Sequence, residues 1–174
     1  MFLELIATFV AGIAAAGLVM LINKPIGGRL PRWAMPACAG AAMIGFTIWN
    51  EYNWFNHTTS TLPERFEVVS TVEKTAVYRP WTYLAPYVDR FAAVDHESVK
   101  RNPELPDHRI VTVVFMGRWS PVRSVQMMFD CAGNKRFDMV DAFELQPDGL
   151  PSANAGWVQM EADNPLLTGA CQKA

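Results

Sequence analysis

The chain opens with two apolar runs, FLELIATFVAGIAAAGLVMLI at residues 2–22 and WAMPACAGAAMIGFTIWN at residues 33–50, joined by the segment NKPIGGRLPR. A helix needs about 20 mostly apolar residues to cross the hydrocarbon core of a membrane. The first run is long enough. The second is slightly shorter, but Trp33 and Trp49 bracket it, and tryptophan favours membrane interfaces. Glycine and proline in the joining segment end both helices. The sequence therefore predicts a transmembrane helical hairpin over residues 1–50.

The basic residues of this region all lie in the joining segment at residues 23–32, as Lys24, Arg29 and Arg32, and the next one along the chain is Arg65. The positive-inside rule then predicts that this turn is cytoplasmic and that both the N-terminus and everything after the hairpin are exported. A cleaved signal peptide is the alternative. It fits less well, because signal peptides begin with a basic segment and have a shorter apolar core.

Both apolar runs carry small residues at four-residue spacing, which places them on one face of each helix. Small faces let helix backbones approach closely in lipid, where the hydrophobic effect does not drive association. We therefore predict helix packing through these faces, either within the hairpin or against a larger membrane protein. The residues are Thr8, Gly12 and Ala16 in the first helix and Ala37, Ala41 and Gly45 in the second.

The rest of the 174-residue chain is predicted to be an interfacial linker at residues 51–64 and one compact exported domain at residues 65–174. The formal net charge is −2 and no basic stretch stands out, so nucleic acid is not an expected partner. The exported part has two cysteines, Cys131 and Cys171. An even number in an oxidising compartment favours a disulfide between them, with two buried free thiols as the alternative.

Apolar and polar residues alternate in several short stretches of the domain, as they do in strands with one buried face. The charged, proline-containing segment at residues 95–108 is predicted to be an exposed loop. The expected fold class is a two-helix transmembrane hairpin followed by a mainly antiparallel β-domain, with α+β as the open alternative. The predicted strands are residues 66–72, 109–116, 122–130, 136–145 and 157–161.

The most distinctive stretch of the domain is VYRPWTYLAPYVDRF at residues 77–91, whose two prolines argue against a regular helix. Tyrosine and tryptophan combine an apolar body with a polar group, which suits contacts with a protein partner or with lipid headgroups. A loop packed over one sheet face is the alternative. The candidate partner-contact residues are Tyr78, Trp81, Tyr83, Tyr87 and Phe91.

The C-terminal third of the chain carries a recognisable pattern. A strand ends in Asp130-Cys131, and a polar alternating strand, a glycine turn, Trp157 near the start of a short strand and a final Cys171 follow. This pattern resembles the surface-adhesin protein E family, which implies a small exported antiparallel sheet with a terminal disulfide. No functional residue is carried over, because the matching positions look structural. As a whole, the chain looks like small inner-membrane proteins of Gram-negative bacteria, which implies an inner-membrane location with the N-terminus and the C-terminal domain in the periplasm.

No motif in the sequence indicates catalysis or a cofactor. The histidines, His57, His96 and His108, form no HxxxH or HExxH pair, and no serine lies in a G-x-S-x-G context. Methionines at strand spacing could indicate copper handling through thioethers, but they are more often core residues. We therefore expect no metal, no cofactor and no catalytic residue.

These observations predict a non-catalytic module, anchored in the membrane, that serves as an accessory, assembly or stabilising subunit of a membrane complex. Its expected partners are membrane lipid and a larger membrane protein, and a small-molecule ligand is left open. The alternative is a periplasmic module that binds a ligand or an envelope polymer. An enzyme or a copper carrier is the least favoured hypothesis.

Overall fold

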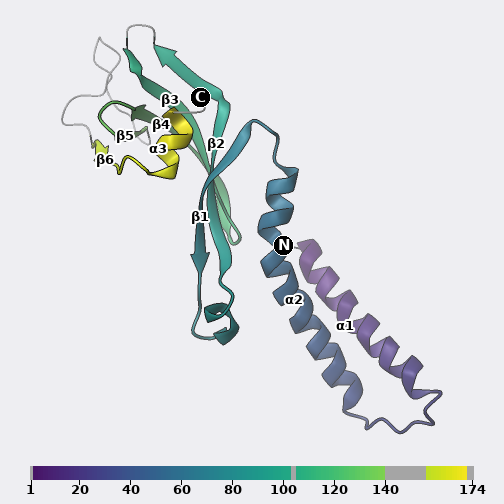
Figure 1. The fold of residues 1–174 in the computed structure, drawn as a ribbon. Coiled ribbons are helices and arrows are strands. Elements are labelled where there is room, and N and C mark those ends of the chain that lie inside the picture. Colours follow the sequence, from purple (N-terminus) through teal and green to yellow (C-terminus); the bar gives the residue numbers. More distant parts are fainter. Residues whose placement is uncertain (1, 103–104, 140–155, 172–174) are drawn as a thin grey trace. The chain divides into compact units, whose positions relative to one another are not determined.

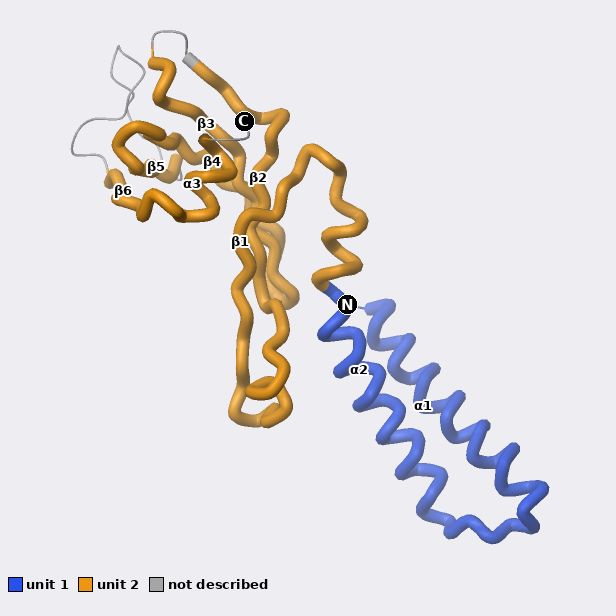
Figure 2. The backbone as a smooth tube through the Cα atoms, viewed as in Figure 1, with its two compact units in different colours: residues 1–54 blue, residues 55–174 orange. Residues whose placement is uncertain are grey.

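The computed structural model describes residues 2–102, 105–139 and 156–171 of the chain. The chain divides into a helical unit, Met1–Trp54, and a sheet unit, Phe55–Ala174 (Figure 2). The sheet unit therefore begins earlier than the predicted boundary at residue 65. Residues 140–155, which include most of the predicted strand at 136–145, lie outside the described part.

The helical unit contains α1 (Phe2–Asn23) and most of α2 (Ala34–Thr61), which run antiparallel (Figure 1). Gly27 and Gly28 in the connection have φ angles of 72° and 73°, a left-handed conformation that glycine adopts without steric cost. The predicted helical hairpin is therefore present, with glycines where the turn needs them.

Among the described residues, α1 is the one helix that is long and apolar enough to cross a membrane, with a mean hydropathy of 2.5 over its most apolar window. Its large apolar side chains are mostly exposed, and Gly12 is its one buried residue among those described. A helix that is apolar on all sides is stable when its surroundings are apolar too. α2 does not meet the same criterion, because its apolar part ends at Trp49 and polar residues follow.

α2 continues past the predicted end at residue 50 and takes in most of the predicted linker at residues 51–64. Pro63 is the first helix breaker in that stretch. The hydroxyl groups of the stretch bond to carbonyls one turn earlier, as when Thr59 Oγ1 donates to the Phe55 carbonyl at 2.9 Å. The prediction of a linker there is therefore wrong, because these polar residues satisfy their hydrogen bonds within the helix.

The two helices pack closely at Gly12. A Cβ added to Gly12 would lie 2.8 Å from Met43 Cγ and 3.7 Å from the Ala39 carbonyl oxygen, so a larger residue would require the Met43 side chain to move. Thr8 and Ala16, one turn away on either side, are half-buried. The small face of α1 thus lies against α2, as close helix approach in lipid requires.

The small face predicted for the second helix does not lie against α1. Ala37, Ala41 and Gly45 are all exposed, and a Cβ added to Gly45 would meet nothing within 4 Å. The interpretation of these residues as the hairpin packing face is therefore wrong. The physical reason is that one glycine suffices for close approach when a flexible methionine side chain, here that of Met43, fills the space over it.

Over its described residues, the sheet unit is built on one antiparallel sheet of six strands in sequential order, which confirms the predicted antiparallel arrangement (Figure 1). Besides the sheet, the unit has a 3₁₀ helix η1 (Pro80–Tyr83) and a short helix α3 (Pro165–Cys171), which the sequence did not predict. The strands are β1 (Phe66–Lys74), β2 (Tyr87–Asn102), β3 (Leu105–Gly117), β4 (Ser120–Asp130), β5 (Lys135–Met139) and β6 (Val158–Gln159).

Most of the predicted loop at residues 95–108 is strand, since β2 runs on to Asn102 and β3 begins at Leu105. The β2–β3 register shifts between Asp95 and Lys100, so a bulge takes up the charged residues. Ser98 supports the bulge, because its Oγ accepts a hydrogen bond from the Thr112 amide at 2.9 Å. The loop prediction is wrong because side-chain hydrogen bonds keep this irregular strand in the sheet.

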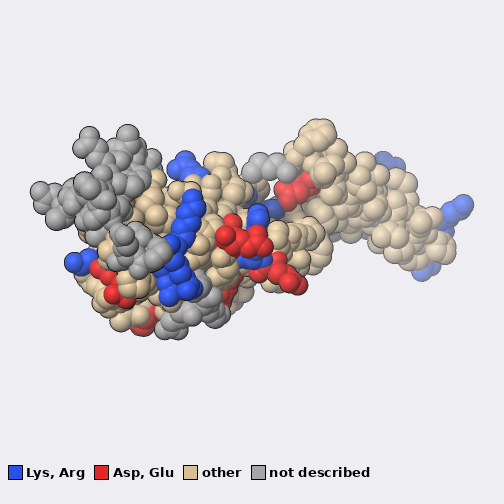
Figure 3. All heavy atoms as spheres, turned by 90° about the horizontal axis from the view of Figure 1, so that it is seen from above, with Lys and Arg blue, Asp and Glu red and all other residues tan. Residues whose placement is uncertain are grey.

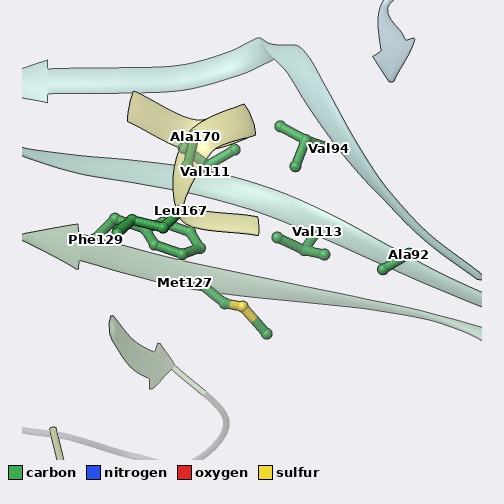
Figure 4. Close-up of a cluster of buried hydrophobic side chains, with 8 residues drawn as sticks. All are labelled: Ala92, Val94, Val111, Val113, Met127, Phe129, Leu167 and Ala170. Carbon is green, nitrogen blue, oxygen red and sulfur yellow. The ribbon is translucent and has the colours of Figure 1, made fainter. Parts of the chain in front are cut away.

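One face of the sheet carries the main core. Valines from β2 and β3 and Met127 and Phe129 from β4 are buried there, beneath Leu167 and Ala170 of α3 (Figure 4). Two interactions hold α3 in place. The Arg109 guanidinium donates to the carbonyl oxygens of Ala170 and Cys171 at 3.2 and 2.6 Å, which caps the helix. The predicted Cys131–Cys171 disulfide is confirmed, and it joins the end of α3 to the end of β4.

Candidate functional site

The loop between β1 and β2, residues 75–86, is the candidate docking surface, and we call it the hairpin tip. Tyr87 and Val88 pair with β1 and not with β3, so this hairpin extends past the β3–β4 turn, as Figure 1 shows. Within the tip, Ala76 and Arg79 form an isolated bridge, and η1 follows directly. The tip is therefore the far end of a two-stranded projection of the sheet.

A buried threonine fixes the conformation of the tip. Thr82 is 1% exposed, and its Oγ1 accepts a hydrogen bond from the Ala76 amide at 2.9 Å. The same hydroxyl donates to the Arg79 carbonyl at 2.7 Å. One side chain thus satisfies polar backbone groups on both sides of the bend, so the loop has a defined shape without an apolar core of its own.

The side chains around this buried threonine point outward and are apolar. Val77 is 84% exposed and Leu84 is 91% exposed, and the rings of Tyr78, Trp81 and Tyr83 are exposed as well. Scattered single apolar residues on a surface are normal, but five on one short loop form a patch. A patch of aromatic and aliphatic side chains on an ordered loop is typical of an interaction surface.

Two of the five predicted contact residues are buried and do not belong to the hairpin tip. Tyr87 and Phe91 are 4% and 2% exposed, so their interpretation as partner contacts is wrong. Both belong to β2, where alternate residues from Tyr87 to Ala93 are buried. The Phe91 ring meets the Phe55 ring edge-on, with centroids 5.4 Å apart, so it packs against the end of α2 within the sheet unit.

Positive charge accompanies the exposed aromatic residues. The Arg79 guanidinium lies 5.3 Å from the centroid of the Tyr78 ring. The β3–β4 turn lies at the same end of the sheet, because Arg90 of β2 pairs with Gly117 at the end of β3. In that turn, the Arg118 guanidinium lies 5.2 Å from the ring centroid of the exposed Trp119. Both turns at this end therefore combine an exposed ring with a guanidinium group.

α3 covers just part of one face of the sheet. Next to these turns, the uncovered part of that face forms a groove of about 690 Å³, within the usual range for ligand pockets. Ala92, Phe115 and Val125 contribute to its lining, and Leu166 of α3 closes one side. Arg90 and Arg123 also line it, and none of the lining residues that the structure describes is acidic.

Comparison with protein-family models, with curated proteins and with solved structures finds no match to this chain. The resemblance to the surface-adhesin protein E family therefore stays a prediction. Any statement about function has to come from the residues and their geometry.

Within the described residues, no group of three or more histidine, cysteine or carboxylate side chains lies together as a metal site would require. Met127 and Met128 are both buried, but as neighbours in one strand they point to opposite faces of the sheet. His96 Nε2 lies 2.9 Å from Glu67 Oε2, a single pair between β2 and β1. The expectation that the chain holds no metal or cofactor stays a prediction.

Sequence reasoning found the tip but missed the groove. The tip is continuous in sequence, and its density of tyrosine and tryptophan is visible there. The groove combines residues from four strands and α3, and a seven-residue helix is too short to show a helical period. No local pattern could have located Arg90 and Arg123 beside the same cavity.

Proposed function

We propose that this chain is a non-catalytic module anchored in the bacterial inner membrane, with its N-terminus and its β-domain in the periplasm. In this proposal it serves as an accessory, assembly or stabilising subunit of a larger membrane complex. The observation that carries the proposal is the hairpin tip. An ordered loop that keeps Val77 and Leu84 in solvent gains stability when a partner covers it, because apolar surface then leaves water.

The membrane anchor is supported by α1 and by charge. α1 exposes apolar side chains along its length, which lipid would cover. In Figure 3 one end of the helical unit carries Lys and Arg, while most of the rest of that unit's visible surface is uncharged. The Cys131–Cys171 disulfide favours an oxidising compartment for the β-domain. Helix composition, charge placement and cysteine chemistry are independent, and all three agree with an exported domain on a membrane anchor.

The topology is tested with fusions to a reporter enzyme that is active only outside the cytoplasm. Fusion after Ala174 is expected to give an active reporter, because the basic residues are confined to the turn at residues 23–32. The same reporter inserted into that turn is the matched control and is expected to be inactive. The reverse pattern would contradict both the topology and the oxidising compartment.

The partner surface is tested by native gel electrophoresis of gentle detergent extracts. The wild-type chain is expected to migrate in a large complex. Trp81→Ala and Tyr83→Ala are each expected to reduce its recovery about tenfold, because large rings at the centre of an interface contribute most of its binding energy. Val158→Ser, at an exposed apolar residue of β6, is the control and should have no effect. A small lone species for the wild-type chain, or equal recovery of all variants, would contradict a partner at the tip.

The second candidate function is a periplasmic ligand- or polymer-binding module, and the groove beside α3 is the observation that favours it. Its lining is largely apolar, which suits an acyl chain better than a polar envelope polysaccharide. The two functions do not exclude each other, since the groove and the tip are separate features of the sheet unit.

A further inference from the structure

The groove lies beside α3, on the part of the sheet face that α3 does not cover, and it is continuous across four strands. Ser70, Ala92, Phe115 and Arg123 are paired in one row from β1 to β4, and the next row is Val72, Arg90, Gly117 and Ser120. Paired residues of adjacent strands point to the same face, so each row presents its side chains together. α3 covers the neighbouring core, and Leu166 in its first turn borders the groove, so α3 does not cover these two rows.

The two rows differ in chemistry along their length. Val72, Ala92 and Phe115 provide an apolar floor, and Val125 extends it on β4. Gly117 has no side chain, and a Cβ placed there would lie 3.2 Å from Arg90 Cγ, so the stem of Arg90 lies close over the glycine. Arg90 therefore lies within the second row, between Val72 and Gly117, and Arg123 ends the first row on β4.

The two arginines are not equivalent. Arg90 Nε lies 3.3 Å from Asp89 Oδ2, so this guanidinium already has a carboxylate partner. No carboxylate pairs with Arg123 in the part of the chain that the structure describes, and Arg123 is exposed. One guanidinium remains available beside an apolar groove, and a guanidinium binds a carboxylate through two parallel hydrogen bonds.

We propose that this groove binds a single-chain amphiphile with a carboxylate head, of the fatty-acid type. Its acyl chain lies on the floor formed by Val72, Ala92, Phe115 and Val125, and its carboxylate pairs with Arg123. Each methylene of the acyl chain that leaves water for the apolar floor contributes to binding. A polar polymer has few such groups to bury there. One available guanidinium matches one monovalent head. The site does not depend on the hairpin tip or on a protein partner, so it is independent of the subunit function proposed first. It rests on the second, ligand-binding candidate and names the class of its ligand.

The proposal is tested on the full chain in phosphatidylcholine nanodiscs with a photoactivatable analogue of laurate. After irradiation, labelled peptides are mapped by mass spectrometry. Labels on α1 and α2 report the probe dissolved in the bilayer and serve as an internal reference. We expect additional labels on the peptides of β2, β3 and β4 that line the groove. Unlabelled laurate should compete for these additional labels, whereas dodecanol, which has the same chain without the charge, should not.

Arg123→Gln is expected to lower the groove labels about tenfold relative to the helix labels, the effect of losing one charge-assisted pair. Arg101→Gln, an exposed arginine of β2 outside the groove lining, is the matched control and should leave them unchanged. Ser70→Phe, which fills the groove from β1, should reduce them without changing the charge. The Cys131–Cys171 disulfide and unchanged hydrogen exchange in β3 show that each variant is folded.

Four results would overturn the proposal. Labels confined to residues 2–61 would mean that the probe binds only with the bilayer. Equal competition by dodecanol, or full labelling of Arg123→Gln, would remove the carboxylate from the recognition. Stronger competition by dodecyl phosphate than by laurate would assign the head to a phosphate and contradict the carboxylate assignment.

Discussion

Replacement of Cys131 with alanine is expected to lower the free energy of unfolding of the β-domain by about 2–5 kcal/mol, the usual effect of removing a native disulfide from a small exported domain. The bond joins residues 40 apart in sequence, so its loss lets the unfolded chain sample many more conformations. It also ties the end of α3 to β4. Without it, α3 is held by the Arg109 hydrogen bonds and by its apolar contacts with the sheet.

The measurement is urea unfolding of the full chain in detergent, followed by near-ultraviolet circular dichroism. Cys38→Ala is the matched control, because Cys38 is a free, exposed cysteine of the helical unit and should leave the midpoint unchanged. Equal midpoints for Cys131→Ala and the wild type would contradict the prediction. So would two alkylatable thiols in addition to Cys38 in protein purified without reductant.

Phe91→Ala is expected to destabilise the β-domain by about 3–5 kcal/mol, as large aromatic truncations in a core do. The Phe91 ring is buried and packs edge-on against Phe55, so its removal leaves a cavity and ends a favourable ring contact. Tyr83→Ala is the contrast, since an exposed ring on the hairpin tip should change stability by less than about 0.5 kcal/mol.

Hydrogen exchange in the full chain, measured on peptides of β2 and β3, separates these two variants. Phe91→Ala should speed exchange across both strands, because the sheet opens as a cooperative unit. Tyr83→Ala should leave β2 and β3 as protected as in the wild type. If both variants speed exchange alike, the tip is part of the core and cannot serve as a free docking surface.

The division of the aromatic segment shows why its residues cannot be interpreted as one group. Pro86 separates the loop from β2, and from Tyr87 onward the side chains alternate between the two faces of the sheet. Before that point, Thr82 takes the buried position in the tip, and the tyrosines and tryptophan around it are left in solvent. Ring density alone therefore predicts neither burial nor exposure.

Local patterns in the sequence were sufficient to predict several features of the structure. The hydropathy of residues 2–22 predicts α1, and the glycines between the apolar runs predict the turn. Strand alternation predicts most of β1, β3 and β4, because a period of two reports one buried face directly. The cysteine count predicts the disulfide, since just two cysteines lie outside the helical hairpin.

Other features depend on contacts between residues that are distant in sequence, and these the tertiary structure decided. Met43 over Gly12 selects which face of α2 packs in the hairpin, although another face has smaller residues. α3 is stable because Arg109, the disulfide and the sheet hold it, since a helix of this length has little stability by itself. The groove with Arg90 and Arg123 exists because α3 covers just part of one face of the sheet. Periodicity reports local geometry, whereas burial depends on which element covers which face.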